Sequence, residues 1–415
     1  MPTAPAVPFN HLVPPDLHDP YPLYERLRRE GPVVFNPLFD LWFVTRHEEA
    51  VSVVKDPVRF SSADILKPAH HLAPEALAVL GDDHSHVYPL LSGDPPAHTR
   101  VRSLVGKAFT PQRAAALEPR IRAIATELLD GLAGESRADL IHRFAYPLPM
   151  RVTGEMFGVR ASDMDDIKRW CDDETLFLMA PLSPERQVEC ARSVAAYRRY
   201  LRTLVEEHRA APRGDLVDVL IDAQNEGESP LGTDEIVGAL CVLIFAGHLT
   251  TTNMIGNTLW HLLRRPGAWQ ALRDDPSLIP ATVEEVLRFD APVQGMTRTV
   301  TEATELGGVV LPKGARVFVL FASANRDSAC FANPDHLDAR RVPQAQHLAF
   351  GRGPHFCMGA ALARLEGRVA LEALTQRLPN ARLVSEVAPE YSPNLVHRGP
   401  SALHVAWGSP EAHAR

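Results

Sequence analysis

Cysteine is scarce in this sequence, and its few copies are far apart. There are five in 415 residues: Cys171, Cys190, Cys241, Cys330 and Cys357. An odd number of widely spaced cysteines argues against a disulfide framework, and no Cys-x-x-Cys pair indicates a metal site. At least one cysteine is therefore available as a ligand.

The sequence also lacks a long apolar run, a basic excess and a targeting segment. No stretch reaches the roughly 20 apolar residues that a membrane span needs. The net charge of −8 differs from the basic footprint of a nucleic-acid-binding protein. Residues Met1–His11 show no basic region followed by an apolar run, so we read no signal peptide. We therefore expect a cytoplasmic protein that binds neither nucleic acid nor a membrane.

No Ser/Gly/Pro-rich linker and no internal repeat divides the chain. Length alone would favour two or three domains, because single cores usually stop growing at roughly 250–300 residues. Without a linker, we expect residues 1–415 to form one domain, with an irregular segment at 1–18. The apolar content of 45% is ordinary for a globular protein, and the core can be large enough to enclose a bulky cofactor.

The spacing of apolar residues predicts a mainly α chain with a small β part. The longest predicted helix runs from Thr233 to Arg264. Its middle is apolar all round, as expected of a helix buried in a large core. The other predicted elements are helices at 21–30, 113–132, 280–289 and 359–378, strands at 33–35 and 41–45, and a strand-like stretch at 298–319 with a turn at 312–314.

The richest segment is Phe350–Gly359, with the sequence FGRGPHFCMG. Its glycines and Pro354 predict a tight loop, and Cys357 follows just before a helix. A helix N-terminus favours a thiolate, and a loop of this kind can direct N–H groups at one sulfur and so tune a bound metal. Haem iron is one metal that takes a single cysteine thiolate. A lone cysteine is more often a small buried hydrophobe, which is what we expect of the other four.

This segment resembles the haem-ligand signature of the cytochrome P450 superfamily, F-G-x-G-x-H-x-C-x-G, at all six specified positions. The resemblance extends from about Asp19 to Trp407 and is closest to the soluble bacterial members. It implies the mainly α, triangular-prism fold enclosing haem b. Cys357 would be the iron ligand, in a loop that includes Phe350, Gly351, His355 and Gly359. The implied activity is insertion of one oxygen atom from O2 into a C–H bond or an alkene.

A second motif, Glu285–Arg288, matches the E-x-x-R helix motif of the same family. Residues at i and i+3 share a helix face and can form an ion pair, although an isolated pair of this kind is usually an exposed salt bridge that contributes little to stability. The resemblance implies that this pair braces the loop leading to the ligand. It further implies a downstream arginine that completes the network, for which we select Arg340 over Arg341.

Four cationic positions fall where the family binds the two haem propionates. His98 and Arg102 are at i and i+4, so they would face the same way on one helix. Arg298 and His355 are the others. Taken alone, each is more often a solvated side chain, but buried carboxylates need such partners.

Ala246–Thr251, AGHLTT, resembles the oxygen-binding part of the family's long helix. The small Ala246 and Gly247 would let the helix pass close to a flat ring, and Thr250 could open the helix locally by bonding a backbone carbonyl. The family's acid is replaced by Leu249, which cannot relay a proton. His248 or the substrate could organise a water chain instead, or the chemistry could be oxidative coupling or peroxide-driven, or the enzyme could be slow and leaky.

Electrons must come from outside, because we recognise no flavin or nucleotide domain. An acidic ferredoxin with its reductase is the expected donor, and a solvated basic face is the competing interpretation. The basic residues expected on the cysteine side of the haem are Arg100, Lys107, Arg113, Arg352, Arg364 and Arg368.

The substrate is expected to be an apolar small molecule, such as a secondary metabolite, by analogy with soluble bacterial members. The rival functions are a haem enzyme that is not a monooxygenase, such as a peroxygenase or isomerase, and a non-catalytic haem or small-molecule binder. The candidate pocket walls are the segments 61–91, 175–184 and 394–396 and the residues Leu243, Val293, Gln294, Met296 and Leu395.

Overall fold

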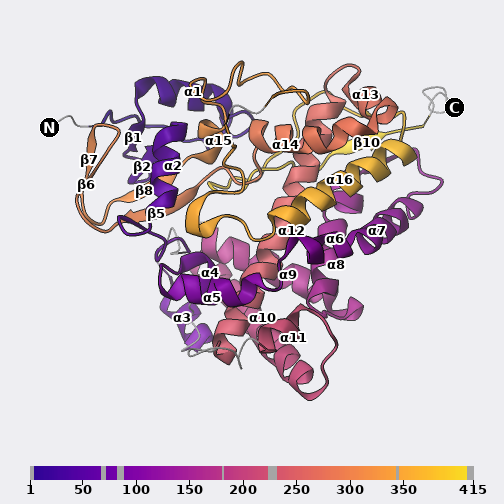
Figure 1. Ribbon diagram of the computed structural model, residues 1–415, viewed down its shortest axis with the longest axis horizontal. Helices are drawn as coiled ribbons and strands as arrows, with labels where there is room; N and C mark the ends of the chain where they lie inside the picture. The colour runs from indigo at the N-terminus through magenta and orange to yellow at the C-terminus, as the bar shows by residue number, and fades with distance from the viewer. Residues whose placement is uncertain are drawn as a thin grey trace. The chain divides into compact units, whose positions relative to one another are not determined.

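The computed structural model describes residues 4–66, 72–81, 88–179, 182–222, 231–342 and 345–408 (Figure 1). The chain divides into two compact units. The first unit comprises Met1–Phe60, Ala114–Pro149 and Leu249–Arg415, and the second comprises Ser61–Arg113 and Met150–His248. Each unit is assembled from separate stretches of sequence. The expectation of one domain over residues 1–415 stays a prediction.

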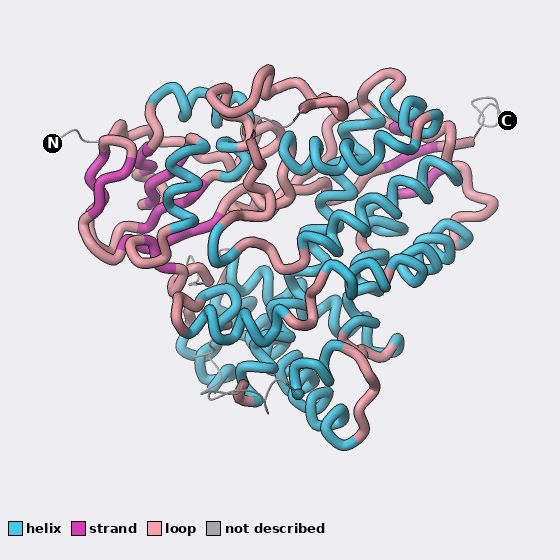
Figure 2. Tube along the Cα trace, viewed as in Figure 1, coloured by secondary structure: helices cyan, strands magenta, loops and turns pink. Residues whose placement is uncertain are grey.

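A five-stranded sheet organises the first unit (Figure 2, magenta). The strand order is β1-β2-β8-β5-β3, in which β2 and β8 are parallel and β1/β2 and β5/β8 are antiparallel. The strands are β1 (Val33–Asn36), β2 (Leu41–Val44), β8 (Arg316–Val319), β5 (Met296–Val300) and β3 (Phe60–Ser61), whose first residue ends a segment of this unit. The two short strands expected near the N-terminus are thus confirmed.

The two faces of this sheet pack against different helices, because neighbouring side chains in a strand point to opposite faces. Phe43 and Phe318 lie in one cluster with the buried face of α1 (Tyr21–Glu30). Val44 and Val319 lie in another with α2 (His47–Lys55) and with Leu348, which precedes the cysteine loop. The sheet therefore supports the segment that leads to Cys357.

The strand-like stretch expected at 298–319 contains residues of four separate strands. A separate hairpin, β6 (Thr304–Leu306) with β7 (Val309–Leu311), is inserted between β5 and β8. The expected turn at 312–314 connects β7 to β8, and Gly314 has a positive φ of 82° there. A three-stranded sheet in the order β4-β10-β9 combines Arg137–Asp139, His404–Ala406 and Arg382–Leu383.

The predicted helix at 113–132 is two helices. α6 (Pro111–Ala116) ends before Leu117, and α7 (Glu118–Asp130) begins after it. Pro119 occupies the first turn of α7, where its missing N–H costs nothing, but it could not lie inside one continuous helix. The remaining helices of the first unit's segments include α13 (Ala268–Asp274), α14 (Ile279–Phe289), α15 (Phe321–Ala324) and α16 (Ala360–Arg377).

The second unit is helical. Its longest helices, α9 (Met164–Met179) and α10 (Pro184–Ala210), pack with α3 (Pro74–Leu80) around an apolar cluster that contains Phe177, Cys190 and Val194. The described segments of this unit also contain α4 (Pro89–Ser92), α5 (Ala97–Gly106) and α11 (Leu216–Asp222), and α8 (Pro147–Met156) begins before it.

α12 (Thr233–Leu263) is a helix of 31 residues, and it ends one residue before the expected boundary. Contrary to our expectation, it is long and apolar enough to cross a membrane by length and composition alone. However, 67% of its most apolar window is buried inside the protein. Burial in a protein core accounts for this composition without a membrane.

Candidate functional site

The cysteine loop is closed by backbone hydrogen bonds. The N–H of Cys357 donates to the carbonyl of Phe350 at 2.9 Å, and α16 begins three residues after the cysteine. Gly351 and Gly353 have φ values of 65° and 72°, a region that favours glycine. A Cβ atom at Gly353 would also clash with the backbone of Val54. The sequence therefore folds here into the tight loop that its glycines predict.

Cys357 differs from the buried cysteines in its surroundings. It is half-buried, whereas Cys171, Cys190 and Cys241 are buried. Burial raises the pKa of the Cys190 thiol to about 11 and also raises the pKa values of Cys171 and Cys241, so these three are protonated thiols at neutral pH. Cys357 instead lies beside the N-terminus of α16, whose partial positive charge favours a thiolate. These features fit a haem ligand.

One stripe of α12 is open although most of the helix is buried. Ala246 is exposed and Leu243, Gly247 and Thr250 are half-buried, while residues 251–262 are all buried. The four positions have the i, i+3, i+4, i+7 spacing of one helix face. A flat cofactor or substrate fits against such a face. Gly247 has a further reason to be small, because a Cβ atom there would lie 2.9 Å from Thr153 Oγ1.

Glu285 and Arg288 form a buried ion pair on α14. Arg288 Nε and a terminal nitrogen of Arg288 donate to the two carboxylate oxygens of Glu285 at 2.9 and 2.8 Å. The Arg288 side chain is 3% exposed and the Glu285 side chain is 5% exposed. Burial alone would raise the pKa of Glu285, but the bonds and charge of Arg288 outweigh it and lower that pKa. The pair is therefore ionised.

The third member of this network is Arg341, so our expectation for Arg340 is wrong. Arg341 Nε donates to Glu285 Oε1 at 3.0 Å, and its terminal nitrogens donate to backbone carbonyls that include those of Asn333 and His336. Arg340 is exposed, and its backbone N–H donates to Asp338 Oδ1 at 2.9 Å. Adjacent side chains in this irregular segment point in different directions. Two consecutive arginines in the sequence therefore do not indicate which of them contacts Glu285.

Asn325, which the sequence did not single out, joins this network to the cysteine loop. Its backbone carbonyl accepts from Arg288 at 3.0 Å, and its side-chain oxygen accepts from the N–H of Leu348 at 2.6 Å. Leu348 is two residues before Phe350. The ion pair therefore braces the segment leading to Cys357 through one asparagine.

Comparison with known proteins identifies the family. Residues 67–381 match the model of the family described as Cytochrome P450. The chain belongs to the cytochrome P450 family.

Individual relatives are similar over most of their length. The chain is 39% identical to "Cytochrome P450 monooxygenase PikC" of Streptomyces venezuelae, over 94% of this chain and 91% of that protein. It is 38% identical to "6-deoxyerythronolide B hydroxylase" of Saccharopolyspora erythraea, over 87% and 89%. The structure of "cytochrome P450 CREJ in complex with (4-ethylphenyl) dihydrogen phosphate" has a TM-score of 0.91 and 35% identity, covering 98% and 100% of the two chains. The expected fold is thus confirmed.

Membership makes the protein an oxidoreductase of the P450 monooxygenase family, whose cofactor is haem with its iron. Such enzymes take small-molecule substrates, O2 and electrons from redox partners.

The four expected propionate-binding residues are distributed over both units. His98, buried, and Arg102, half-buried, lie on α5 of the second unit. Arg298, buried in β5, and the half-buried His355 of the cysteine loop belong to the first unit. Two of these cationic or ionisable groups are thus buried, as binding to a buried carboxylate requires.

The expected substrate contacts fall into two groups. Val293, Met296 and Leu395 are half-buried, and so is Leu243 on α12. Gln294 is buried and its amide is already used, since Nε2 donates to the Ala291 carbonyl at 2.7 Å and Oε1 accepts from the Tyr24 hydroxyl at 3.1 Å. These bonds hold the Gln294 amide inside the protein, and its contact with substrate stays a prediction. The expected walls at 61–91 and 175–184 lie partly outside the described residues.

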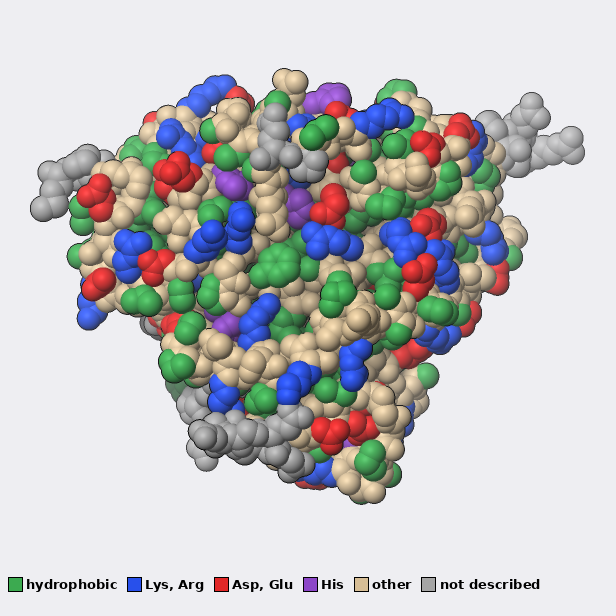
Figure 3. Space-filling view, in the orientation of Figure 1, with side chains coloured by type: hydrophobic (Ala, Val, Ile, Leu, Met, Phe, Trp, Pro, Cys, Tyr) green, Lys and Arg blue, Asp and Glu red, His purple; other side chains and the backbone are tan. Residues whose placement is uncertain are grey.

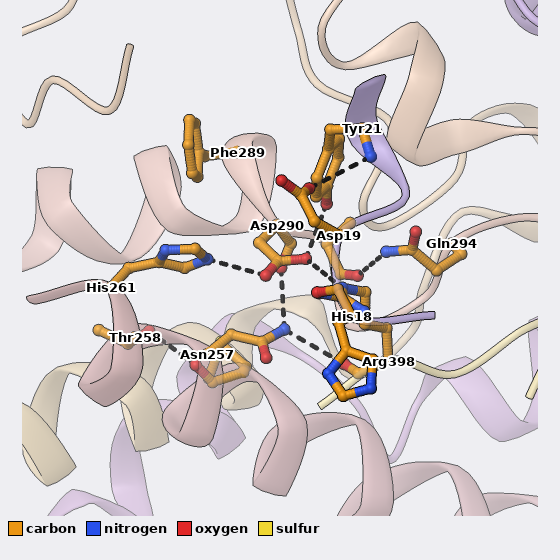
Figure 4. A network of polar contacts seen from close by, with 12 residues as sticks. His18, Asp19, Tyr21, Asn257, Thr258, His261, Phe289, Asp290, Gln294 and Arg398 are labelled. Carbon is orange, nitrogen blue, oxygen red and sulfur yellow. Dashed lines mark hydrogen bonds and ion pairs between the residues drawn. The ribbon is translucent and has the colours of Figure 1, made fainter. Parts of the chain in front are cut away.

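Asp290 is the centre of a buried network that holds the turn containing Leu395 (Figure 4). Its carboxylate accepts hydrogen bonds from the Tyr21 hydroxyl at 2.7 Å and from Arg398 Nε at 3.1 Å. The same carboxylate lies 2.8 Å from His261 Nε2. The backbone N–H of Arg398 donates to the Pro292 carbonyl, and Val293 forms an isolated antiparallel bridge with His397. The turn is thereby fixed beside Val293.

Several of the basic residues that we expected on the cysteine side have acidic partners. Over α7 and α16, blue and red side chains alternate in Figure 3. There Arg368 binds Glu118 and Glu372, at 2.6 and 3.1 Å. Arg364 binds Glu284, and in the second unit Arg100 binds Glu235. The net positive charge of these residues is therefore smaller than the sequence suggests.

Proposed function

We propose that the protein inserts one oxygen atom from O2 into an apolar secondary metabolite, by hydroxylation or epoxidation, with Cys357 as the haem ligand. The supporting observation is the position of Cys357, half-buried in a glycine-shaped loop at the N-terminus of α16. We further propose that it works in the cytoplasm.

The cysteine loop and three residues outside it would hold the cofactor. Phe350, Gly351, His355 and Gly359 would shape the space around the Cys357 sulfur, and Gly359 leaves open the position where a Cβ atom would lie 4.0 Å from that sulfur. His98, Arg102, Arg298 and His355 would bind the propionates. When bound, the haem supplies the chemistry of O2 activation, which the thiolate promotes by donating electron density.

The open stripe of α12 would form the oxygen side of the site. Ala246 and Gly247 would leave room there, and the half-buried Thr250 hydroxyl would hold a proton donor or a water molecule in place. Leu249 favours a second candidate function, oxidative coupling or peroxide-driven chemistry, because this position cannot deliver a proton. Products formed under labelled dioxygen, compared with products formed from added unlabelled peroxide, separate the two, since only insertion of an oxygen atom from O2 places the label in the product.

The apolar character of the candidate substrate contacts supports an apolar substrate. Leu243, Val293, Met296 and Leu395 are partly accessible and carry no polar side-chain group apart from the thioether. The names of relatives include a 6-deoxyerythronolide B hydroxylase and a steroid C26-monooxygenase. Both names describe enzymes that add oxygen to a small molecule, which supports the same type of reaction for this chain.

A ferredoxin with its reductase is the proposed electron source. Lys107 and Arg113 are exposed, and Arg352 is half-buried. An acidic partner would be attracted to these residues, with a dependence on ionic strength. Reduction by a ferredoxin should slow steeply as salt is added, and salt-insensitive reduction would argue against this docking.

The ligand proposal is tested spectroscopically. The purified haem protein, reduced and exposed to carbon monoxide, should show the strongly red-shifted absorption of a thiolate-bound haem. Cys357→Ala should abolish it, whereas Cys330→Ala, at another half-buried cysteine, should not. A colourless preparation, or an unchanged spectrum in Cys357→Ala, would overturn the proposal.

A further inference from the structure

Phe350, the first residue of the cysteine loop, is packed against two side chains that share one carboxylate. The Arg364 guanidinium lies over its ring, 4.5 Å from the ring centre, and the His347 ring centre is 5.9 Å away. Arg364 Nε and a terminal nitrogen donate to the two oxygens of Glu284 at 2.5 and 3.0 Å. His347 Nε2 lies 3.2 Å from the same carboxylate. We call Glu284, His347 and Arg364 the Phe350 clamp.

The clamp depends on the shape of an arginine. The bidentate hydrogen bond to Glu284 fixes the orientation of the guanidinium plane, so the guanidinium can stack on an aromatic ring. A lysine would keep the charge but has neither the paired donors nor the flat face. The clamp also joins two helices that pack together, since Glu284 lies on α14 and Arg364 on α16 (Figure 1).

Phe350 is connected directly to the proposed ligand. Its carbonyl accepts the hydrogen bond from the N–H of Cys357 at 2.9 Å. A shift of Phe350 would therefore move the backbone that closes the loop around the sulfur, and would let water approach it. Water near the sulfur favours the form of the site with more negative charge, which is the reduced one.

The Glu284 carboxylate of the clamp is ionised at neutral pH. Burial alone would raise the pKa of Glu284, but hydrogen bonds from His347 and Arg364 outweigh it and lower that pKa to about 2. The side chains of Arg364 and Glu284 are 37% and 41% exposed, so the outer part of the clamp is accessible from the surface.

We propose that Arg364 is a positioning residue, which holds Phe350 against the cysteine loop through its stacking and its bond to Glu284 and thereby sets the reduction equilibrium of the haem iron. This inference rests on the proposed ligation by Cys357. It assigns Arg364 a role within the molecule, in addition to any contribution of its charge to partner docking.

The test compares two identical substitutions on one helix. Arg364→Lys keeps the charge and removes the stacked, two-pronged geometry. Arg368→Lys makes the same change one turn further along α16, where the arginine binds Glu118 and Glu372. Both variants and the wild type are loaded with haem and titrated with a chemical reductant in the absence of any protein partner. Circular dichroism and the carbon monoxide spectrum verify folding and ligation.

We expect Arg364→Lys to shift the ferric–ferrous equilibrium about three- to tenfold towards the ferrous form, at most about 59 mV for a one-electron couple. Arg368→Lys should match the wild type. An unchanged potential in Arg364→Lys, a shift towards the ferric form, or an equal shift in both variants would overturn the inference while the red-shifted spectrum remains. Absence of that spectrum in the wild type would instead overturn the ligand proposal and this inference with it.

Discussion

The Asp290 carboxylate and the Arg398 guanidinium lie 3.1 Å apart, although the two residues are 108 positions apart in the chain. Both side chains are largely buried, at 1% and 9% exposed. Arg398 also donates to the backbone carbonyls of Leu17 and His18. One ion pair thus ties the end of α14, the N-terminal segment and the turn before β10 together.

Replacing Asp290 by asparagine should destabilise the fold strongly. The change leaves Arg398 buried without its anion, and loss of one member of a buried pair costs about 3–5 kcal/mol. Urea unfolding of the haem-loaded protein measures this. Glu25→Gln, which removes an exposed pair with Arg29, should cost less than about 1 kcal/mol. Equal effects of the two substitutions would contradict the structural role of Asp290.

Because of Glu366, the free energy of unfolding should decrease as the pH rises from about 4.3 to about 8. It is 1% exposed on α16, and burial raises its pKa to about 8. In the unfolded chain the carboxyl loses its proton near its ordinary pKa of about 4.3. Between these values the folded state binds the extra proton, so the free energy of unfolding decreases with pH by at most about 1.4 kcal/mol per unit.

Glu366→Gln removes this titration. From pH 5 to pH 7.5 its free energy of unfolding should decline less than that of the wild type, by a difference of up to about 3 kcal/mol. Chemical unfolding at the two pH values checks this. Glu386→Gln, at an exposed position, should follow the wild type. Parallel pH profiles for Glu366→Gln and the wild type would refute the assignment.

Arg341 and Arg340 should differ although they are neighbours. Arg341→Gln removes a bond to the buried Glu285, so we expect a loss of about 1–3 kcal/mol and faster release of haem. Arg340→Gln changes an exposed side chain and should alter stability by less than about 0.5 kcal/mol. Thermal unfolding and haem transfer to an acceptor protein measure both effects. Equal haem release from the two variants would argue against the Glu285 network as a brace.

Leu249→Glu tests whether a missing proton relay limits the reaction. If it does, the variant should form more product per reductant consumed, because a carboxyl group can pass protons and leucine cannot. Leu249→Gln, of similar size but unable to release a proton, should not improve this ratio. The measurement compares product with reductant and peroxide in each variant. A lower or unchanged ratio in Leu249→Glu would count against the relay.

Local features of the sequence are sufficient to predict much of the secondary structure and part of the candidate site. The glycines around Cys357 predicted its loop, because positive φ values favour glycine locally. The apolar stretch of α12, the helix at 21–30 and the strands at 33–35 and 41–45 were likewise readable within one or two residues. In each case the determining interactions lie within a few residues along the chain.

Only the tertiary structure decided which side chains meet. It selected Arg341 over Arg340 for Glu285, and it joined the Gln294 amide to the Tyr24 hydroxyl. It stacked Arg364 on Phe350 and paired it with Glu284. It also brought Asp290 to Arg398. Such partners are distant in sequence, and the direction of each side chain depends on how helices, strands and irregular segments pack, which no local pattern encodes.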